Sequence, residues 1–146
     1  MNSIAILGAG TWGMALAKML KNTNKNVTVW SALPDEIEEL SKTSRHPKLP
    51  NVLIPKGIEY TTDIKLAVEN KDIIMFAVPS VFVRQTARKC KDYIKDNQII
   101  VDVAKGIEPD TLFTLTQVID DEIKNKTVKY VALSGPTHAE EVSRDM

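Results

Sequence analysis

The sequence predicts an α/β fold of the Rossmann type, in which a doubly wound, mainly parallel sheet carries helices on both faces. Three observations predict this class: short β-rich runs recur along the chain, helical patterns separate most of them, and several runs are almost continuously apolar. Continuously apolar strands are typical of parallel sheets that are covered on both faces. A regular alternation of strand and helix indicates right-handed βαβ units.

Six strands are predicted from short runs rich in β-branched and apolar residues. A chain of 146 residues fits one ordinary domain, so we expect these strands in a single sheet. The predicted strands span residues 3–7, 26–30, 58–61, 72–78, 98–104 and 128–134.

Four helices are predicted between the strands. They span residues 11–21, 34–42, 80–94 and a segment that begins at residue 109. The second begins with Pro34 and two acidic residues, which suit the first turn of a helix because proline lacks an N–H there and the macrodipole favours negative charge. The fourth has Leu112, Leu115 and Ile119 at helical spacing, so its apolar face is expected to start near residue 109.

Residues 41–57 form one long irregular stretch with three prolines, and we expect a loop at the edge of the sheet. Arg45, His46 and Lys48 make it locally basic, with His46 exposed. A long loop of this kind is either functional or a solvated connection, and the residues leave both open.

Charge and hydropathy exclude several function classes. Lysine plus arginine and aspartate plus glutamate both total 19, so no basic field is available for nucleic acid or anionic lipid. No apolar run approaches the roughly 20 residues that a membrane span needs. The chain enters a strand pattern at once, without a secretory signal, so we expect a cytoplasmic protein. No metal site is predicted.

Cys90 is the only cysteine, so it cannot form an intramolecular disulfide. It shares the apolar face of its predicted helix with Val83, Ala87 and Ile94. We therefore expect a buried structural thiol rather than a nucleophile.

The glycine motif GAGTWG, residues 8–13, lies between the first predicted strand and the first predicted helix. In that context, Gly8 allows a tight turn, Gly10 lets the backbone approach a pyrophosphate, and Gly13 allows close packing of helix on strand. Amide groups at the helix N-terminus, from Thr11 onward, are then available to the phosphates. The motif predicts a dinucleotide site.

The preferred dinucleotide stays open between NAD and NADP. An acidic residue at the end of the second strand usually bonds the adenosine ribose, but Ser31 stands there. Asp35 and Glu36 lie in the next helix and are expected to face solvent. Without a carboxylate to repel a 2′-phosphate, NADP is also compatible, with Arg45 or Lys48 as its counter-charge.

Other strand ends should meet the same site, because ligands of open α/β sheets lie at the carboxyl ends of the strands. Phe82 follows the fourth strand and is either a contact to a cofactor ring or a core residue. Lys105 is delivered to the mouth by an almost purely apolar strand, where it can hold a carbonyl or phosphate oxygen. Residues 134–142 follow the sixth strand and offer backbone donors at a new helix start; a structural role is expected for His138 within them.

The motifs GAGTWGMALA, AVPS, VAKGIE and SGPTHAEEV, in this order and spacing, resemble the N-terminal domain of bacterial NAD(P)-dependent glycerol-3-phosphate dehydrogenase. The resemblance covers the whole chain, and KGIE followed by SGPTHAEE is its most specific part. It implies that residues 1–146 are an N-terminal dinucleotide-binding domain, truncated, and that a helical C-terminal catalytic domain is absent from this chain.

The resemblance also implies roles for single residues. No catalytic residue is expected in this chain, because the family's general acid/base lysine would lie beyond Met146. The implied substrate-binding residues are Lys105, Gly135 and Thr137. The implied cofactor-binding residues are Gly8, Gly10, Thr11, Trp12, Gly13, Ser31, Phe82, Lys105 and Ala139.

The activity implied by the resemblance is the reversible NAD(P)H-dependent reduction of dihydroxyacetone phosphate to sn-glycerol 3-phosphate for glycerophospholipid synthesis. Many relatives have a basic residue near positions 31 and 32, where this chain has Ser31 and Ala32, which weakens any expectation of strict NADP preference. We expect the chain alone to bind cofactor weakly and to turn over little or no substrate.

Three other interpretations stay open. The chain is alternatively a free-standing NAD(P)-binding or sensor module without catalysis, a dehydrogenase for another small substrate such as a hydroxy acid, or a nonfunctional remnant. A homodimer is compatible with the sequence, because exposed sheet edges and apolar patches favour self-association.

Overall fold

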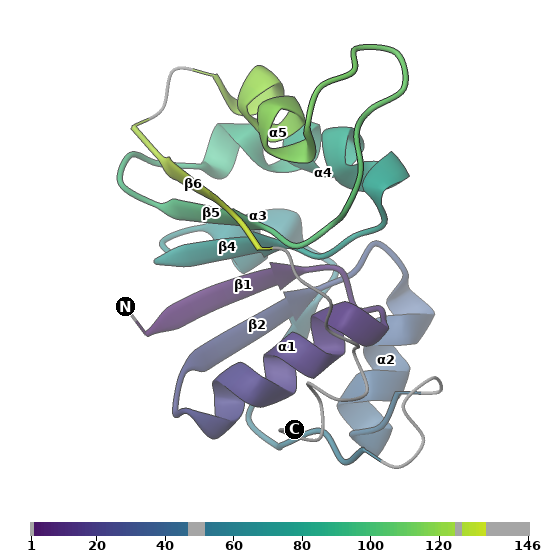
Figure 1. Cartoon of the computed structure of the whole chain (residues 1–146). Coiled ribbons are helices and arrows are strands. Elements are labelled where there is room, and N and C mark those ends of the chain that lie inside the picture. The colour runs from purple at the N-terminus through teal and green to yellow at the C-terminus, as the bar shows by residue number, and fades with distance from the viewer. Residues whose placement is uncertain (1, 47–51, 125–126, 134–146) are drawn as a thin grey trace.

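A computed structural model describes residues 2–46, 52–124 and 127–133. The α/β prediction is confirmed: six strands form one parallel sheet in the order β3-β2-β1-β4-β5-β6 (Figure 1). The chain starts in the middle of the sheet, extends it to one side, and then crosses over to extend it to the other. The strands are β1 (Ser3–Leu7), β2 (Asn26–Trp30), β3 (Glu59–Thr61), β4 (Ile73–Phe76), β5 (Ile99–Asp102) and β6 (Lys129–Ala132).

The first two strands have their predicted bounds, and the other four are shorter than predicted. β4 stops at Phe76 because the chain soon reaches Pro79, which has no N–H to donate to a ladder. β5 stops at Asp102 because the amide of Ala104 donates to the Asp102 carboxylate, at 3.0 Å, instead of to a neighbouring strand. Both ends release the chain toward the same edge of the sheet.

The helices are α1 (Thr11–Asn22), α2 (Pro34–Thr43), α3 (Ile64–Val68), α4 (Val83–Cys90) and α5 (Leu115–Ile123). Short 3₁₀ turns at Ser80–Phe82 and Lys91–Tyr93 flank α4, so the helix predicted over residues 80–94 is in three pieces. α3 was not predicted from the sequence. Its signal was Asp63, whose carboxylate accepts from the amides of Lys65 and Leu66 at the start of the helix.

The prediction that the last helix starts at residue 109 is wrong. Thr114 and Gln117 form a reciprocal capping box that starts α5 at Leu115. Leu112, which we assigned to the apolar face, has a φ of 62° and is 70% exposed, so it lies in a turn outside the helix. The capping residues override an apolar periodicity that continues upstream by chance.

Helices cover both faces of the sheet (Figure 1), and a core of apolar side chains lies on each face. In β1, Ala5 and Leu7 face the core formed with α3, α4 and α5, whereas Ile4 and Ile6 face the core formed with α1 and α2. Side chains of a strand alternate between faces, so burial on both faces explains why this strand is continuously apolar.

The stretch 41–57 only partly behaves as the expected edge loop. α2 extends to Thr43, and the described residues after it include Val52 and Ile54, which are 3% and 1% exposed and belong to the α1/α2 core. The connection is therefore anchored to the core rather than simply solvated.

Candidate dinucleotide site

A cavity of about 770 Å³ opens at the carboxyl ends of the central strands. The strand order reverses between β1 and β4, and doubly wound sheets bind ligands at such a switch point. Four segments line the cavity: the glycine loop, the segment after β2, the segment after β4 with α4, and the segment after β5. The lining residues are 8–12, 30–33, Glu36, 77–80, Phe82, Gln85, Thr86, Lys89 and 103–105.

Two of the three motif glycines are required by the fold. Gly8 has a φ of +127°, and a Cβ there would lie 2.8 Å from backbone atoms of Ala77 and Val78. A Cβ on Gly13 would overlap the Gly8 carbonyl. These glycines let α1 and the turn before it pack closely against the sheet.

Gly10 is different, because the fold does not require a glycine there. Its φ of −74° is open to any residue, and a Cβ added to it meets no heavy atom within 4 Å. The space beside it is part of the cavity. The backbone at Gly10 is therefore accessible from the cavity.

The N-terminus of α1 opens onto this space. Gly10 is the N-cap, so no side chain caps the first-turn amides, and Thr11 and Trp12 also line the cavity. Uncapped amides and the positive end of the helix dipole favour an anionic group. The loop and helix start therefore fit a pyrophosphate.

Ser31 lies at the end of β2 and is 4% exposed. Its hydroxyl donates to Glu36 Oε1 at 2.7 Å and accepts from the amide of Leu33 at 3.1 Å. Asp35 is exposed as expected, but the expectation that Glu36 faces solvent is wrong, since Glu36 lines the cavity. Because Pro34 is the first residue of α2, Glu36 is the third, from which a side chain reaches back past the helix start.

The basic residues of the stretch 41–57 are not brought to the end of β2. Arg45 is exposed and is absent from the cavity lining, and Lys48 lies outside the described residues. His46 was expected to be exposed, which is wrong. It is 6% exposed, and its Nε2 hydrogen-bonds the carbonyl of Ala9 at 3.1 Å, so it supports the glycine loop.

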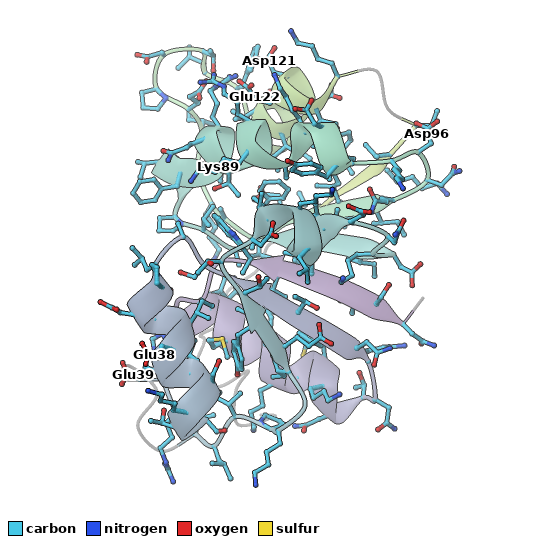
Figure 2. The ribbon with its side chains drawn as sticks, turned by 180° about the vertical axis from the view of Figure 1, so that it is seen from behind. Glu38, Glu39, Lys89, Asp96, Asp121 and Glu122 are labelled. Carbon is cyan, nitrogen blue, oxygen red and sulfur yellow. The ribbon has the colours of Figure 1, made fainter. Side chains whose placement is uncertain are left out.

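The wall after β4 carries Phe82 and Lys89. Phe82 is 49% exposed and lines the cavity, which favours a ligand contact over a core role. Lys89 lies on α4 (Figure 2). Its Nζ is 5.6 Å from the centroid of the Trp30 ring at the end of β2. Lys89 was not among the predicted site residues, because only the packing of α4 on the sheet brings it beside Trp30.

Lys105 follows β5, is exposed and lines the cavity. Gly106, next in the chain, has a φ of +116°, which turns the backbone away after the lysine. Lys105 thus lies at the mouth predicted for it, across the sheet from Ser31.

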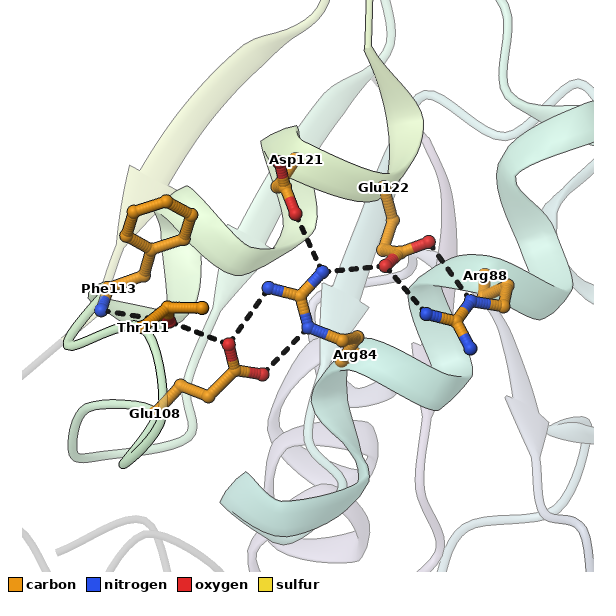
Figure 3. Close-up of polar contacts among 7 residues, drawn as sticks. All are labelled: Arg84, Arg88, Glu108, Thr111, Phe113, Asp121 and Glu122. Atoms are coloured by element: carbon orange, nitrogen blue, oxygen red, sulfur yellow. Dashed lines mark hydrogen bonds and ion pairs between the residues drawn. The ribbon is translucent and has the colours of Figure 1, made fainter.

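A network of ion pairs holds the loop that carries Lys105 against α4 (Figure 3). The Arg84 guanidinium donates from Nε and Nη2 to the two oxygens of Glu108, at 2.7 and 2.8 Å. It also pairs with Asp121 and Glu122 of α5, and Glu122 pairs with Arg88. These hydrogen bonds hold the pKa of Glu108 and that of Glu122 at about 2, below their ordinary value.

Two buried groups near this wall have raised pKa values. The prediction of a buried structural thiol is confirmed for Cys90, which is 0% exposed and whose pKa burial raises to about 12. Burial likewise raises the pKa of Asp102 to about 6, although the amide of Ala104 donates to its carboxylate. Neither residue lines the cavity.

The remaining predicted site residues, Gly135, Thr137 and Ala139, lie outside the described residues, as does His138. Within residues 2–46, 52–124 and 127–133, no histidine, cysteine and carboxylate side chains cluster as a metal site would require. In the same part of the chain, no helix is long and apolar enough to span a membrane.

The fold and the glycine loop at its switch point define a Rossmann-type domain of the dinucleotide-binding class. Within this class the chain belongs to a particular family. The model of the family described as NAD-dependent glycerol-3-phosphate dehydrogenase N-terminus matches residues 3–146.

Individual relatives agree with this assignment. The chain is 61% identical to glycerol-3-phosphate dehydrogenase [NAD(P)+] 2 of Lactobacillus delbrueckii subsp. bulgaricus, with 100% of the chain and 44% of that protein covered. It is 49% identical to glycerol-3-phosphate dehydrogenase [NAD(P)+] of Fusobacterium nucleatum, with 99% and 43% covered. The crystal structure of glycerol-3-phosphate dehydrogenase from Coxiella burnetii superposes with a TM-score of 0.90 at 30% identity, covering 99% of this chain and 44% of that one. The chain therefore spans less than half the length of these relatives.

Proposed function

We propose that this chain is the cofactor-binding part of an NAD(P)-dependent glycerol-3-phosphate dehydrogenase. The proposed reaction is the reversible reduction of dihydroxyacetone phosphate to sn-glycerol 3-phosphate. The single observation that carries the cofactor part is the open space beside Gly10, at an uncapped helix N-terminus inside the cavity. Family membership and the names of the relatives support the substrate.

In this proposal, different segments along the cavity bind different parts of the dinucleotide. Gly10 and the amides at Thr11 and Trp12 bind the pyrophosphate, and the end of β2 binds the adenosine ribose. Phe82 packs against the dinucleotide from the β4 side. A nicotinamide cofactor, when bound, supplies the hydride that reduces the carbonyl to an alcohol.

Lys105 acts at the substrate end of the cavity. Its side chain is brought there by β5, and its ammonium group can hold a phosphate or carbonyl oxygen and stabilise negative charge that develops on that oxygen. Gly135 and Thr137 are proposed to complete the substrate site.

We further propose that the family's two-domain organisation applies here. In this proposal residues 1–146 are the N-terminal dinucleotide-binding domain, and a helical domain supplies the lysine that donates the proton to the product alkoxide. The chain's coverage of 44% of the first relative supports this organisation.

Calorimetric titration with NADH and NADPH tests the proposed function on three forms of the chain: unsubstituted, Gly10→Val and Gly13→Ala. Because the Cβ beside Gly10 meets open space, Gly10→Val should unfold at the unsubstituted temperature but lose at least about tenfold in affinity, as expected when a phosphate loses backbone hydrogen bonds. Gly13→Ala is the matched contrast, because its Cβ overlaps Gly8 and should cost about 3 kcal/mol of stability. A folded, unsubstituted chain that binds neither nucleotide would contradict the proposal.

A further inference from the structure

Glu36 presents a carboxylate at the end of β2, at the place where a Rossmann domain meets the adenosine ribose. It lines the cavity together with Trp30, Ser31 and Leu33, and its Oε1 accepts from the Ser31 hydroxyl at 2.7 Å. We infer that Glu36, oriented by Ser31, selects NAD(H) over NADP(H) in this cavity. The inference rests on the proposed function and adds its cofactor preference.

Ser31 has no proton left to donate to a ribose oxygen. Its hydroxyl donates its one proton to Glu36 and accepts from the Leu33 amide, which leaves a single neutral lone pair. The charged acceptor for a ribose hydroxyl that approaches this end of the cavity is therefore the Glu36 carboxylate. Ser31 is a positioning residue, since it orients that carboxylate.

The contact between Ser31 and Glu36 follows from how α2 begins. Leu33 is the N-cap, and its amide donates to the Ser31 hydroxyl, while Glu36 is at the third helical position. A glutamate at that position normally reaches back to the N-cap amide. Here Ser31 lies between the two groups, so the carboxylate is drawn over the end of β2 and into the cavity lining.

The charge of Glu36 distinguishes the two dinucleotides. A carboxylate accepts hydrogen bonds from the 2′- and 3′-hydroxyls of an unmodified ribose, whereas it repels a 2′-phosphate that carries up to two negative charges. Arg45, the described basic residue expected to offset that phosphate, is exposed and does not line the cavity. The local charge thus favours NAD(H).

Lys89 is the positive group that opposes this argument. Among the described lining residues it is the cation beside the end of β2, with its Nζ 5.6 Å from the Trp30 ring centroid. The Trp30 ring is a cation–π partner for the Lys89 ammonium, so this ammonium has a partner when no phosphate is bound. If Lys89 instead bound a 2′-phosphate, NADPH affinity would depend on Lys89 and not on Glu36, and the two assignments can be separated by substitution.

The experiment compares dissociation constants of NADH and NADPH, by titration calorimetry, for four forms of the chain: unsubstituted, Glu36→Gln, Glu38→Gln and Lys89→Gln. Glutamine at residue 36 has nearly the same shape and keeps an oxygen that can accept from Ser31, but it removes the charge and replaces the second acceptor oxygen with an NH2 donor. Glu38 is the matched control, because it is on the same helix and pairs with Lys42 at the surface, with its side chain 60% exposed (Figure 2). Thermal unfolding of each variant verifies that it is folded.

We expect the unsubstituted chain to prefer NADH by about tenfold or more, and Glu36→Gln to reduce that ratio by about tenfold, as is typical of one charged hydrogen bond. Glu38→Gln should leave the ratio unchanged. A chain that prefers NADPH, a ratio unaffected by Glu36→Gln, or a ratio that changes in Lys89→Gln instead would overturn the inference while leaving cofactor binding intact. Absence of binding for both nucleotides in all folded forms would overturn the proposed function, and this inference with it.

Discussion

Asp102, the last residue of β5, holds a carboxyl group that is 5% exposed and receives one backbone hydrogen bond, from Ala104. One hydrogen bond does not offset the loss of solvation, so burial raises the pKa of Asp102 from 3.8 to about 6. The folded chain then keeps this proton to a higher pH than the unfolded chain. The free energy of unfolding therefore falls as the pH rises from about 4 to about 6 and stays lowered above that range.

Asp102→Asn should abolish the decrease in the free energy of unfolding between about pH 4 and about pH 6. Asparagine keeps an oxygen for the Ala104 amide but carries no charge, so we expect the variant to be more stable by about 2 kcal/mol at pH 7, with the difference disappearing below about pH 4. Urea unfolding at a series of pH values measures this, with exposed Asp110→Asn as the control. A variant that is less stable at pH 7 would mean that the folded chain stabilises the Asp102 carboxylate more strongly than the single hydrogen bond from Ala104 indicates.

Single residues also explain why the glycine motif is informative. A Cβ on Gly8 or Gly13 would meet backbone atoms, whereas a Cβ on Gly10 would meet none, so the same residue type serves packing at two positions and leaves open space at the third. The spacing of the motif predicted the two packing roles, and the ligand role of Gly10 stays a prediction.

At the scale of elements, the contact of α4 with the segment between β5 and α5 is electrostatic. Glu108 lies three residues after Lys105. Its carboxylate accepts hydrogen bonds from Nε and Nη2 of Arg84 and from the Thr111 hydroxyl, the last at 2.6 Å. The same loop is closed by backbone hydrogen bonds between Glu108 and Phe113 and between Leu112 and Glu108. Arg84 is thus a bridge from the cavity wall to the segment that carries Lys105 (Figure 3).

Glu108→Gln should loosen this segment in a pH-dependent way. The Arg84 pairing holds the pKa of Glu108 at about 2, so its stabilisation is complete above the ordinary value of 4.5 and is lost as the pH falls toward about 2. We expect faster amide hydrogen exchange in residues 104–114 and a lower unfolding temperature at pH 7, and a much smaller effect of the substitution near pH 2. Glu38→Gln, which removes an exposed pair with Lys42, should change neither quantity. Unchanged exchange at pH 7 would show that the backbone hydrogen bonds alone order the segment.

At the scale of the whole molecule, two cores on opposite faces of one sheet make the fold cooperative. Cys90 is a probe of one of them, since it lies in the core formed with α3, α4 and α5 and its thiol donates to the Ala87 carbonyl at 3.5 Å. Its side chain becomes accessible only when that core opens.

The thiol should therefore react only on unfolding. Its pKa of about 12, against an ordinary value of 9.0, and its burial predict that modification by a thiol reagent at pH 8 is more than about a hundredfold slower than in denaturant. Introducing a cysteine at exposed Ser41 gives the internal control, because it should add one rapidly reacting thiol. Rapid modification of Cys90 in the native chain would indicate that this core opens locally.

Much of the fold could be predicted from the sequence, because its determinants are local. The conformation of a segment depends strongly on its own apolar runs, on the proline at the start of α2 and on the glycines between β1 and α1. These local features predicted the α/β class and the bounds of β1 and β2. The errors were also local. Apolar periodicity placed the start of the last helix too early, despite the Thr114 and Gln117 capping box, and the Asp63 cap of α3 was not recognised.

The side chains around the cavity depended on tertiary structure, because their contacts join segments far apart in the chain. His46 bonds Ala9 across 37 residues, and Arg84 reaches Glu108 across 24. Lys89 meets Trp30 only because α4 packs over the end of β2. Glu36 is close to Ser31 in sequence, yet only the direction in which α2 leaves the sheet decides whether its carboxylate faces solvent or the cavity. Sequence periodicity indicates which face of an element is buried, whereas the orientation of one element on another decides which polar groups meet at its edge.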